Sequence, residues 1–159
     1  MKKIGWILLG AAVILVGMQF LPVSKTNPPI TGEIQVAADV RQVLRRACYD
    51  CHSNETRWPW YSHVAPISWL LINHVEEGRE HLNFSEWNKY DAAKQAKLLK
   101  KSWQEVKEGE MPINTYVWQH PAAKLTEADQ ALIRRWVTAA LPPGTPLESA
   151  PEKGDKDDD

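Results

Sequence analysis

Four stretches of this chain have apolar residues at the spacing of an amphipathic α-helix, and no stretch alternates as a β-strand does. The first runs into residues 47–54 and the second covers 67–82. The third begins at Asp91 and ends before Gly109, and the fourth begins at Thr126. The apolar positions are Val40, Val43, Leu44 and Ala47; Ile67, Leu70, Leu71 and Val75, with His74 on the same side; Ala93, Ala96, Leu99, Trp103 and Val106; and Leu132, Ile133, Trp136, Val137 and Ala140. The sequence therefore predicts an all-α domain.

Residues with defined turn chemistry mark the ends of these helices. Thr126, with Asp129 three residues on, is typical of a helix N-cap, and Gly109 is typical of a C-terminal stop. Prolines break the segments between the helices, so residues 54–66 and 110–124 are predicted to be loops.

The chain begins with an apolar segment, Ile4 to Leu21, which follows Lys2 and Lys3. Its 18 residues are about the length that crosses a bilayer core. A secretory signal peptide also begins with positive charge, but its apolar part is usually about 7–15 residues and ends at a small-residue cleavage site, which is missing here. We expect an uncleaved transmembrane helix, with a signal peptide as the alternative. In both cases the rest of the chain lies on the periplasmic, extracytoplasmic side.

Four regions follow from these patterns: a membrane anchor or signal peptide at 1–24, a Pro-rich linker at 25–37, a helical domain at 38–141, and a disordered acidic tail at 142–159. From Glu148 onward the tail has six acids and two lysines, a net charge of −4, whereas the whole chain has −1. The body of the protein is nearly neutral, so its charge gives no reason to expect nucleic-acid binding.

Both cysteines of the chain lie in the stretch ACYDCHSN, residues 47–54. C-x-x-C-H is the attachment signature of haem c. In that chemistry Cys48 and Cys51 add to the two vinyl groups of one haem, and His52 binds the iron. Free thiols would not persist in an oxidising compartment, which favours a covalent use of this kind.

Three other interpretations of the two cysteines stay open. A thioredoxin-like redox pair needs a preceding strand, and none is predicted. A structural zinc site needs four ligands, and the histidines lack the usual spacing. A plain disulfide between Cys48 and Cys51 leaves His52 without a role.

The sixth iron ligand of such a haem is predicted to be Met111. Met1 and Met18 belong to the N-terminal segment, so Met111 is the one methionine of the exported part. A thioether ligand favours ferrous iron and a high reduction potential. His63 is the alternative, and it would give a lower potential. His74 lies on an apolar helix face, where a core role is more common.

Eight tryptophans are many for 159 residues, and seven of them follow the N-terminal segment. A small all-α domain can use tryptophan to build its core. A large planar cofactor would account for the number better, because aromatic surface packs well against it.

The order of these features resembles a class I cytochrome c: a short helix, CxxCH, a methionine loop, and a terminal helix beginning LTEADQALIRRWV. The strings CYDCHSNETRWPWYSHVAPISWLLINHVEEGREHLNFSEW and EGEMPINTY are similar to the bacterial haem-binding domain family of membrane-anchored c-type cytochromes. The likeness covers about residues 36–140. It implies one covalent haem c, with His52 and Met111 as axial ligands. Loops of this kind often have a methionine followed by two prolines. In this chain Met111 is followed by Pro112 and then by Ile113.

The sequence thus predicts a membrane-tethered monohaem cytochrome that carries single electrons between redox partner proteins, and not an enzyme. A haem-based redox or gas sensor is the alternative, and a haem peroxidase is the third interpretation. Arg57 is a candidate partner for a haem propionate, although a solvated arginine is more common. The lysines of the third predicted helix are either a docking face for an acidic partner or an ordinary solvated face.

Overall fold

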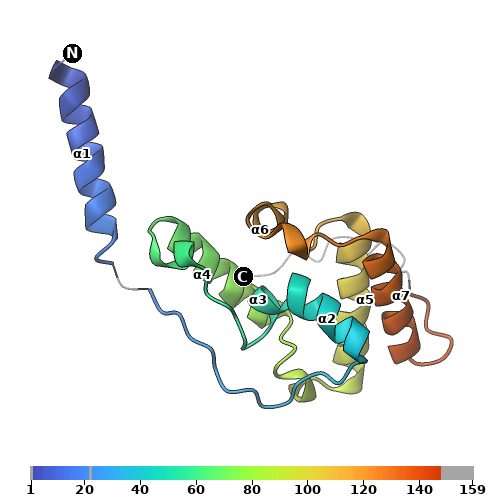
Figure 1. Cartoon of the computed structure of the whole chain (residues 1–159). Helices are drawn as coiled ribbons and strands as arrows, with labels where there is room; N and C mark the ends of the chain where they lie inside the picture. Colours follow the sequence, from blue (N-terminus) through green and yellow to red (C-terminus); the bar gives the residue numbers. More distant parts are fainter. Residues whose placement is uncertain (1, 22, 148–159) are drawn as a thin grey trace. The chain divides into compact units, whose positions relative to one another are not determined.

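The computed structural model describes residues 2–21 and 23–147, and it confirms the all-α prediction (Figure 1). The only β pairing among these residues is an isolated bridge between Gly32 and Glu86. From residue 148 onward the predicted acidic tail lies outside the described residues. The elements, with η for 3-10 helices, are α1 (Lys2–Met18), α2 (Ala38–Ala47), α3 (Tyr49–His52), η1 (Trp60–His63), α4 (Ile67–His81), η2 (Trp87–Lys89), α5 (Ala92–Glu108), α6 (Asn114–Gln119), η3 (Pro121–Ala123) and α7 (Glu127–Ala140).

The chain forms two compact units, each made of two segments. Unit 1 consists of Met1–Ile30 and Tyr49–Ser85, and unit 2 of Thr31–Cys48 and Glu86–Asp159. Unit 1 therefore contains α1, α3, η1 and α4, in which α4 packs against α3 and η1. Unit 2 contains α2, η2, α5, α6, η3 and α7, with α7 beside both α5 and α2.

Unit 2 has an apolar core of the kind that the helical pattern predicts. Its central cluster consists of Val43, Leu99, Trp103, Val106, Ile133, Val137 and Leu141, with Ala96, Leu132 and Trp136 packed against it. Two predicted core positions are wrong, because Ala93 and Ala140 are exposed. Both lie at helix ends, where no neighbouring helix covers them, while Leu98 is buried instead of Ala93.

The predicted helix ends of unit 2 are confirmed. The hydroxyl of Thr126 accepts from the Asp129 N–H, and the Asp129 carboxylate accepts from the Thr126 N–H, which makes a reciprocal capping box on α7. The Asp91 carboxylate caps α5 by accepting from the Lys94 N–H at 2.7 Å. Gly109 ends α5 with φ of 78°, a left-handed conformation that glycine adopts at no steric cost.

Unit 1 has a small and unusually polar core. The buried face of α4 consists of Ser68, Ile72, Val75 and Gly78, whereas Ile67 and Leu70, predicted to face the core, are exposed. The helix itself is confirmed, but its buried face contains a serine and a glycine that an apolar pattern overlooks. Every buried polar residue of the described chain lies in this unit: Asp50, Ser53, Asn54, Thr56, Ser62, Ser68, Asn83 and Ser85.

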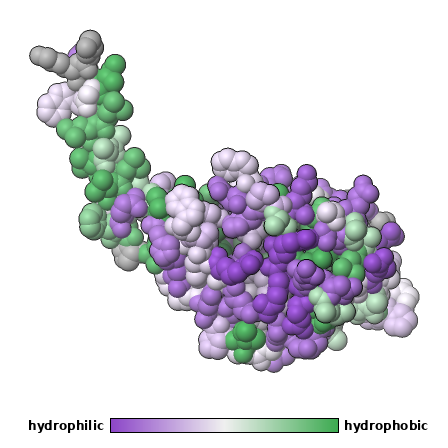
Figure 2. Space-filling model, in the orientation of Figure 1, coloured by the Kyte–Doolittle hydropathy of each residue, from purple (hydrophilic) through white to green (hydrophobic). Residues whose placement is uncertain are grey.

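The N-terminal helix α1 corrects the expectation of a transmembrane helix. It has 17 residues and ends at Met18, so it is about 25 Å long, less than the ~30 Å of a bilayer core. Across residues 2–21 and 23–147, no helix combines the length and the apolar character that crossing a membrane requires. The surface of α1 is nevertheless covered by exposed apolar side chains (Figure 2).

The segment 110–124, predicted to be a loop, contains two short helical elements, α6 and η3. None of the six residues of α6 is buried, so the segment has no apolar periodicity from which a helix could be predicted. Residues 54–66 likewise contain the 3-10 turn η1 between Pro59 and Val64.

Candidate functional site

The CxxCH motif lies where one short helix ends and the next begins. Cys48 is the C-cap residue of α2, and its N–H donates to the Leu44 carbonyl at 2.8 Å. Cys51 and His52 form the last half of α3, in unit 1. Both cysteines are half-buried thiols. The break at Cys48 lets the motif leave α2 and place Cys51 and His52 on a separate helical turn.

The imidazole of His52 is held by the C-terminal turn of α4. Its Nδ1 lies 2.8 Å from the Gly78 carbonyl oxygen and 3.1 Å from that of Leu82. Carbonyl oxygens only accept hydrogen bonds, so Nδ1 has the proton and Nε2 keeps its lone pair. Burial lowers the pKa of His52, outweighing the two carbonyls, so the ring is neutral at physiological pH. A neutral imidazole with an oriented N–H is the form that binds a metal.

Gly78 brings α4 into direct contact with the motif. A Cβ atom at this position would lie 2.7 Å from the Cys51 carbonyl oxygen and 3.2 Å from Cys51 Cβ. Gly78 therefore allows the close approach through which its own carbonyl reaches His52. Beyond the motif, the Phe84 N–H donates to the His52 carbonyl at 2.8 Å, and the Phe84 ring stacks on Tyr49.

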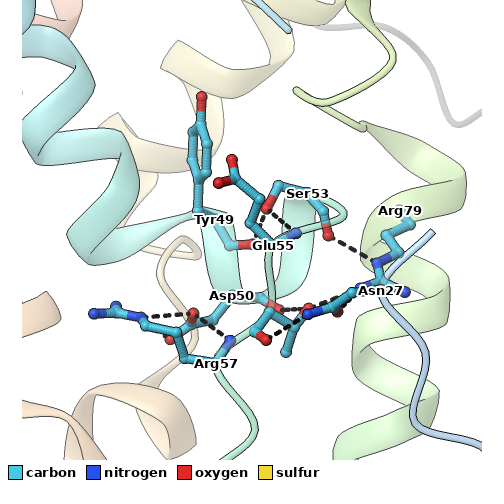
Figure 3. Close-up of polar contacts among 8 residues, drawn as sticks. Asn27, Tyr49, Asp50, Ser53, Glu55, Arg57 and Arg79 are labelled. Carbon is cyan, nitrogen blue, oxygen red and sulfur yellow. Dashed lines mark hydrogen bonds and ion pairs between the residues drawn. The ribbon is translucent and has the colours of Figure 1, made fainter. Parts of the chain in front are cut away.

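The residues that follow the motif fold back onto α3 through side-chain hydrogen bonds (Figure 3). The Thr56 hydroxyl donates to the Asp50 carbonyl at 2.8 Å. The Arg57 backbone N–H and Nε both donate to the Asp50 carboxylate, at 3.2 and 3.3 Å. The predicted propionate partner Arg57 thus already pairs with a buried carboxylate, although its side chain is mostly exposed. A propionate contact of Arg57 stays a prediction.

Arg79 ties the segment before the domain to the motif loop (Figure 3). Its Nε donates to the Ser53 carbonyl at 2.8 Å, and one terminal nitrogen donates to the Thr26 carbonyl at 2.9 Å. The other terminal nitrogen donates to both the Asn27 side chain and the Thr56 hydroxyl at 2.9 Å. One guanidinium therefore joins α4, the loop after the motif and residues 26–27.

The fold around the motif argues against a thioredoxin-like redox pair, because no strand precedes Cys48 among the described residues. Burial, and then the neighbouring Asp50 carboxylate, raise the pKa of the Cys51 thiol to about 11. Cys51 is therefore not a thiolate near neutral pH, and a redox-active pair would depend on Cys48 as its nucleophile. For the zinc alternative, no three His, Cys, Asp or Glu side chains gather as a metal site in the part of the chain that the structure describes.

His63, the alternative axial ligand, is exposed on η1 and already has a partner. Lys25 Nζ lies 2.6 Å from His63 Nδ1 and also donates to the Ser62 carbonyl. An ammonium group has no acceptor, so Nδ1 accepts and the neutral ring has its proton on Nε2. Its outward nitrogen therefore has no lone pair for iron. His74 is half-buried on α4, next to the buried face and not on it.

Met111 lies in unit 2, two residues after Gly109, the C-cap of α5. Its backbone N–H donates to the Glu105 carbonyl at 3.1 Å, which fixes the chain there, while its side chain is exposed. Because His52 belongs to unit 1, the pairing of Met111 with His52 stays a prediction.

The tryptophans of the domain build its core only in part. Among the seven after α1, only Trp103 is buried, whereas Trp60 in unit 1 and Trp118 in unit 2 are 78% and 80% exposed. The core interpretation therefore accounts for Trp103, and for Trp87 and Trp136, which pack against the apolar cluster of unit 2. The exposed rings are large apolar surfaces of the kind that pack against a planar group.

The donor set of the motif fits a c-type haem. Two thiols three residues apart match the two vinyl groups, and His52 supplies a neutral nitrogen ligand whose other N–H is fixed by carbonyls. The residues that sequence reasoning missed are Gly78 and Leu82, which orient that ligand. The lone glycine inside the helical pattern HVEEGREH was a signal of close backbone approach.

Comparison with known protein families identifies one family that matches this chain. The family described as Haem-binding domain matches residues 13–139, which is most of the chain and includes all four predicted site residues. The chain therefore belongs to the haem-binding domain family. No curated protein and no solved structure matches it.

Proposed function

We propose that this member of the haem-binding domain family is a monohaem c-type cytochrome that carries single electrons, with no catalytic residues of its own. In this proposal Cys48 and Cys51 hold the haem covalently, and His52 and Met111 are its axial ligands. When bound, the haem supplies an iron that alternates between the ferrous and ferric states.

The orientation of His52 is the observation that supports the proposal most strongly. Its Nδ1 proton is directed at two carbonyls of α4, and burial keeps the ring neutral. Nε2 is therefore available to iron without a change of protonation or tautomer. The ligand follows directly on two thiols at haem c spacing, which neither a core histidine nor a structural disulfide requires.

The cysteines attach the haem by addition. At each vinyl group the sulfur forms a bond to one carbon, the S–H bond breaks, and the hydrogen ends on the other vinyl carbon. No oxidant or reductant is consumed. The raised pKa of Cys51 keeps it as the thiol, which is the form that this addition uses.

Met111 is preferred over His63 as the sixth ligand because of Lys25. The Lys25 ammonium occupies Nδ1 of His63, so iron binding by this ring would require the loss of that contact or a shift of its proton. Met111 is an exposed thioether whose backbone is fixed by Glu105, and it needs no deprotonation. A thioether ligand favours ferrous iron and a high potential, as an electron carrier needs.

We also propose that the chain after Lys25 lies on the extracytoplasmic side and that its partners are redox proteins. Lys2 and Lys3 before an apolar segment are typical of exported chains. Labelling of intact cells with a reagent that does not cross the membrane would modify the exposed lysines of α5, such as Lys97. Labelling only after cell lysis would contradict this position.

An absorption spectrum of the ferrous protein, with and without carbon monoxide, tests the proposed function. Two strong axial ligands leave no open position, so we expect the spectrum to be unchanged by carbon monoxide at neutral pH. Rapid formation of a carbon monoxide complex would contradict the electron carrier and favour the haem-based gas sensor.

A further inference from the structure

One side of α5 is basic and has no ionic partner among the described residues. Lys94, Lys97 and Lys101 follow at three- and four-residue spacing, so they lie on one side of the helix. This side is away from the buried Leu99 and Trp103, although the buried Leu98 lies beside Lys94 and Lys101. All three are exposed, and their ammonium groups make no hydrogen bond or ion pair within residues 2–21 and 23–147. These three residues are called the lysine face below.

The acids near this face do not pair with it. Glu105, four residues after Lys101 and on the same side of α5, makes no ion pair with it among the described residues. The Asp91 carboxylate is engaged as the N-cap of α5, where it accepts from the Lys94 N–H. Glu108, in the last turn, accepts from the Gln104 amide at 3.1 Å. At Lys94 and Lys97, in the first two turns of α5, the positive charge therefore has no ionic partner among the described residues.

The described chain ends against an apolar cluster to which α5, α7 and α2 contribute. Leu147 packs against the apolar cluster of unit 2, which contains Leu99, Trp103 and Val106 of that helix. The twelve residues that follow, 148–159, reach up to about 40 Å when extended. Since α5 has 17 residues, it is about 25 Å long, and every residue of the lysine face is within that reach.

The segment 148–159 has the charge that the lysine face lacks. It contains six acids and two lysines, for a net charge of −4. Because it is tethered at Leu147, it is present near α5 at the millimolar effective concentration typical of short linkers. A free acidic peptide would have to be present at that level to compete.

We propose that residues 148–159 bind the lysine face of α5 and cover it. Carboxylates of the segment pair with Lys94, Lys97 and Lys101, so the face has an intramolecular occupant. For the proposed electron carrier, and resting on that proposal, an acidic partner protein reaches this face only by displacing the segment. The pairing itself does not depend on haem.

Carbodiimide coupling of the full-length chain tests the pairing, because this reagent joins a carboxylate to an amine only when the two are in contact. After digestion, mass spectrometry should find amide bonds between acids of 148–159 and the lysine face. At about 1 M salt, where the screening length is about 3 Å, these cross-links should be lost. They should also be lost when Lys94, Lys97 and Lys101 are all changed to Gln.

A matched control is Lys124→Gln, which removes an exposed lysine of unit 2 outside α5. It should leave the cross-links to the lysine face unchanged. A mixture of isotopically labelled and unlabelled chains separates pairing within one chain from pairing between two. Three results would overturn the proposal: no cross-links to the lysine face, equal coupling to Lys124, or cross-links mainly between labelled and unlabelled chains. None of them bears on haem binding.

Discussion

At the scale of single residues, the two histidines of unit 1 have opposite protonation patterns for a simple reason. His52 Nδ1 faces carbonyl oxygens, which only accept, and His63 Nδ1 faces an ammonium group, which only donates. The same side chain is thereby prepared as a ligand at one position and blocked at the other. A sequence pattern cannot separate them, because the partners are 26 and 38 residues away.

Exchange of the predicted sixth ligand tests this difference. Met111→Ala should remove the weak red band that a thioether ligand gives ferric haem, and should allow carbon monoxide to bind the ferrous protein. His63→Gln should change neither property, because its ring is paired with Lys25. Absorption spectra of the two variants check both statements. An unchanged Met111→Ala spectrum, or an effect of His63→Gln, would show that the assignment is wrong.

Gly78 should be intolerant of any side chain. In Gly78→Ala the added methyl group meets the Cys51 backbone at 2.7 Å, so α4 or α3 must move and the His52 hydrogen bonds must lengthen. We expect a loss of about 1–3 kcal/mol in the free energy of unfolding, as for other overpacked sites, and a lower haem content. Urea denaturation followed by circular dichroism measures the first.

The matched control for Gly78 is another helical glycine. Gly17→Ala, in α1, adds a methyl group that meets nothing within 4 Å, so haem content and stability should stay close to those of the unchanged protein. Equal effects of the two substitutions would argue against a specific role for Gly78.

At the scale of secondary-structure elements, the capping box of α7 makes stability depend on pH. Partial burial would raise the pKa of Asp129, but hydrogen bonds from Thr126 and the Arg46 ion pair outweigh it and lower the pKa. The resulting stabilisation is fully present above the unfolded-state pKa of about 3.9 and is lost as pH falls through the lower folded-state value.

Asp129→Asn should therefore cost about 1 kcal/mol of unfolding free energy at pH 7. That cost should shrink below about pH 4, because the unchanged protein then loses the same carboxylate contacts. Urea titrations at several pH values compare the variant with Glu127→Gln, which removes an exposed acid in the same first turn. If the pH dependence of Asp129→Asn matches that of the unchanged chain, the capping account is wrong.

Arg79 should not be replaceable by lysine. Lys has one ammonium group, which cannot serve acceptors on Thr26, Asn27, Ser53 and Thr56 at once. Arg79→Lys should cost about 1.5–3 kcal/mol of unfolding free energy and expose the bond after Lys25 to trypsin. Arg135→Lys, an exposed arginine of α7, should do neither. Trypsin resistance of Lys25 in Arg79→Lys would contradict the account.

The predictability of the elements follows from what stabilises each one. In unit 2, apolar spacing and caps predicted α5 and α7 with their ends, because an apolar cluster holds them. In unit 1, α4 and its buried Val75 were predicted, but the rest of its buried face was not, because Ser68 and Gly78 lie inward. No residue of α6 is buried, so the sequence has no apolar periodicity there from which this helix could be predicted.

At the scale of the whole molecule, the two units are stabilised by different interactions. Unit 2 depends on apolar packing, whereas unit 1 buries eight polar residues that bond largely to backbone groups. Cys48, Cys51 and His52 were predictable as site residues because haem attachment determines the CxxCH spacing, and all three residues lie within five positions of the sequence. The hydrogen bonds that orient His52 were not, since they depend on how α4 meets α3.

The mass of the denatured protein, produced in cells that mature c-type cytochromes, is the most direct test of the central claim. Thioether bonds survive denaturation, so the chain should keep the added mass of one haem and stain for haem on a denaturing gel. With Cys48 and Cys51 both changed to Ala, the added mass should be absent. Release of the haem on denaturation of the unchanged chain would contradict covalent attachment.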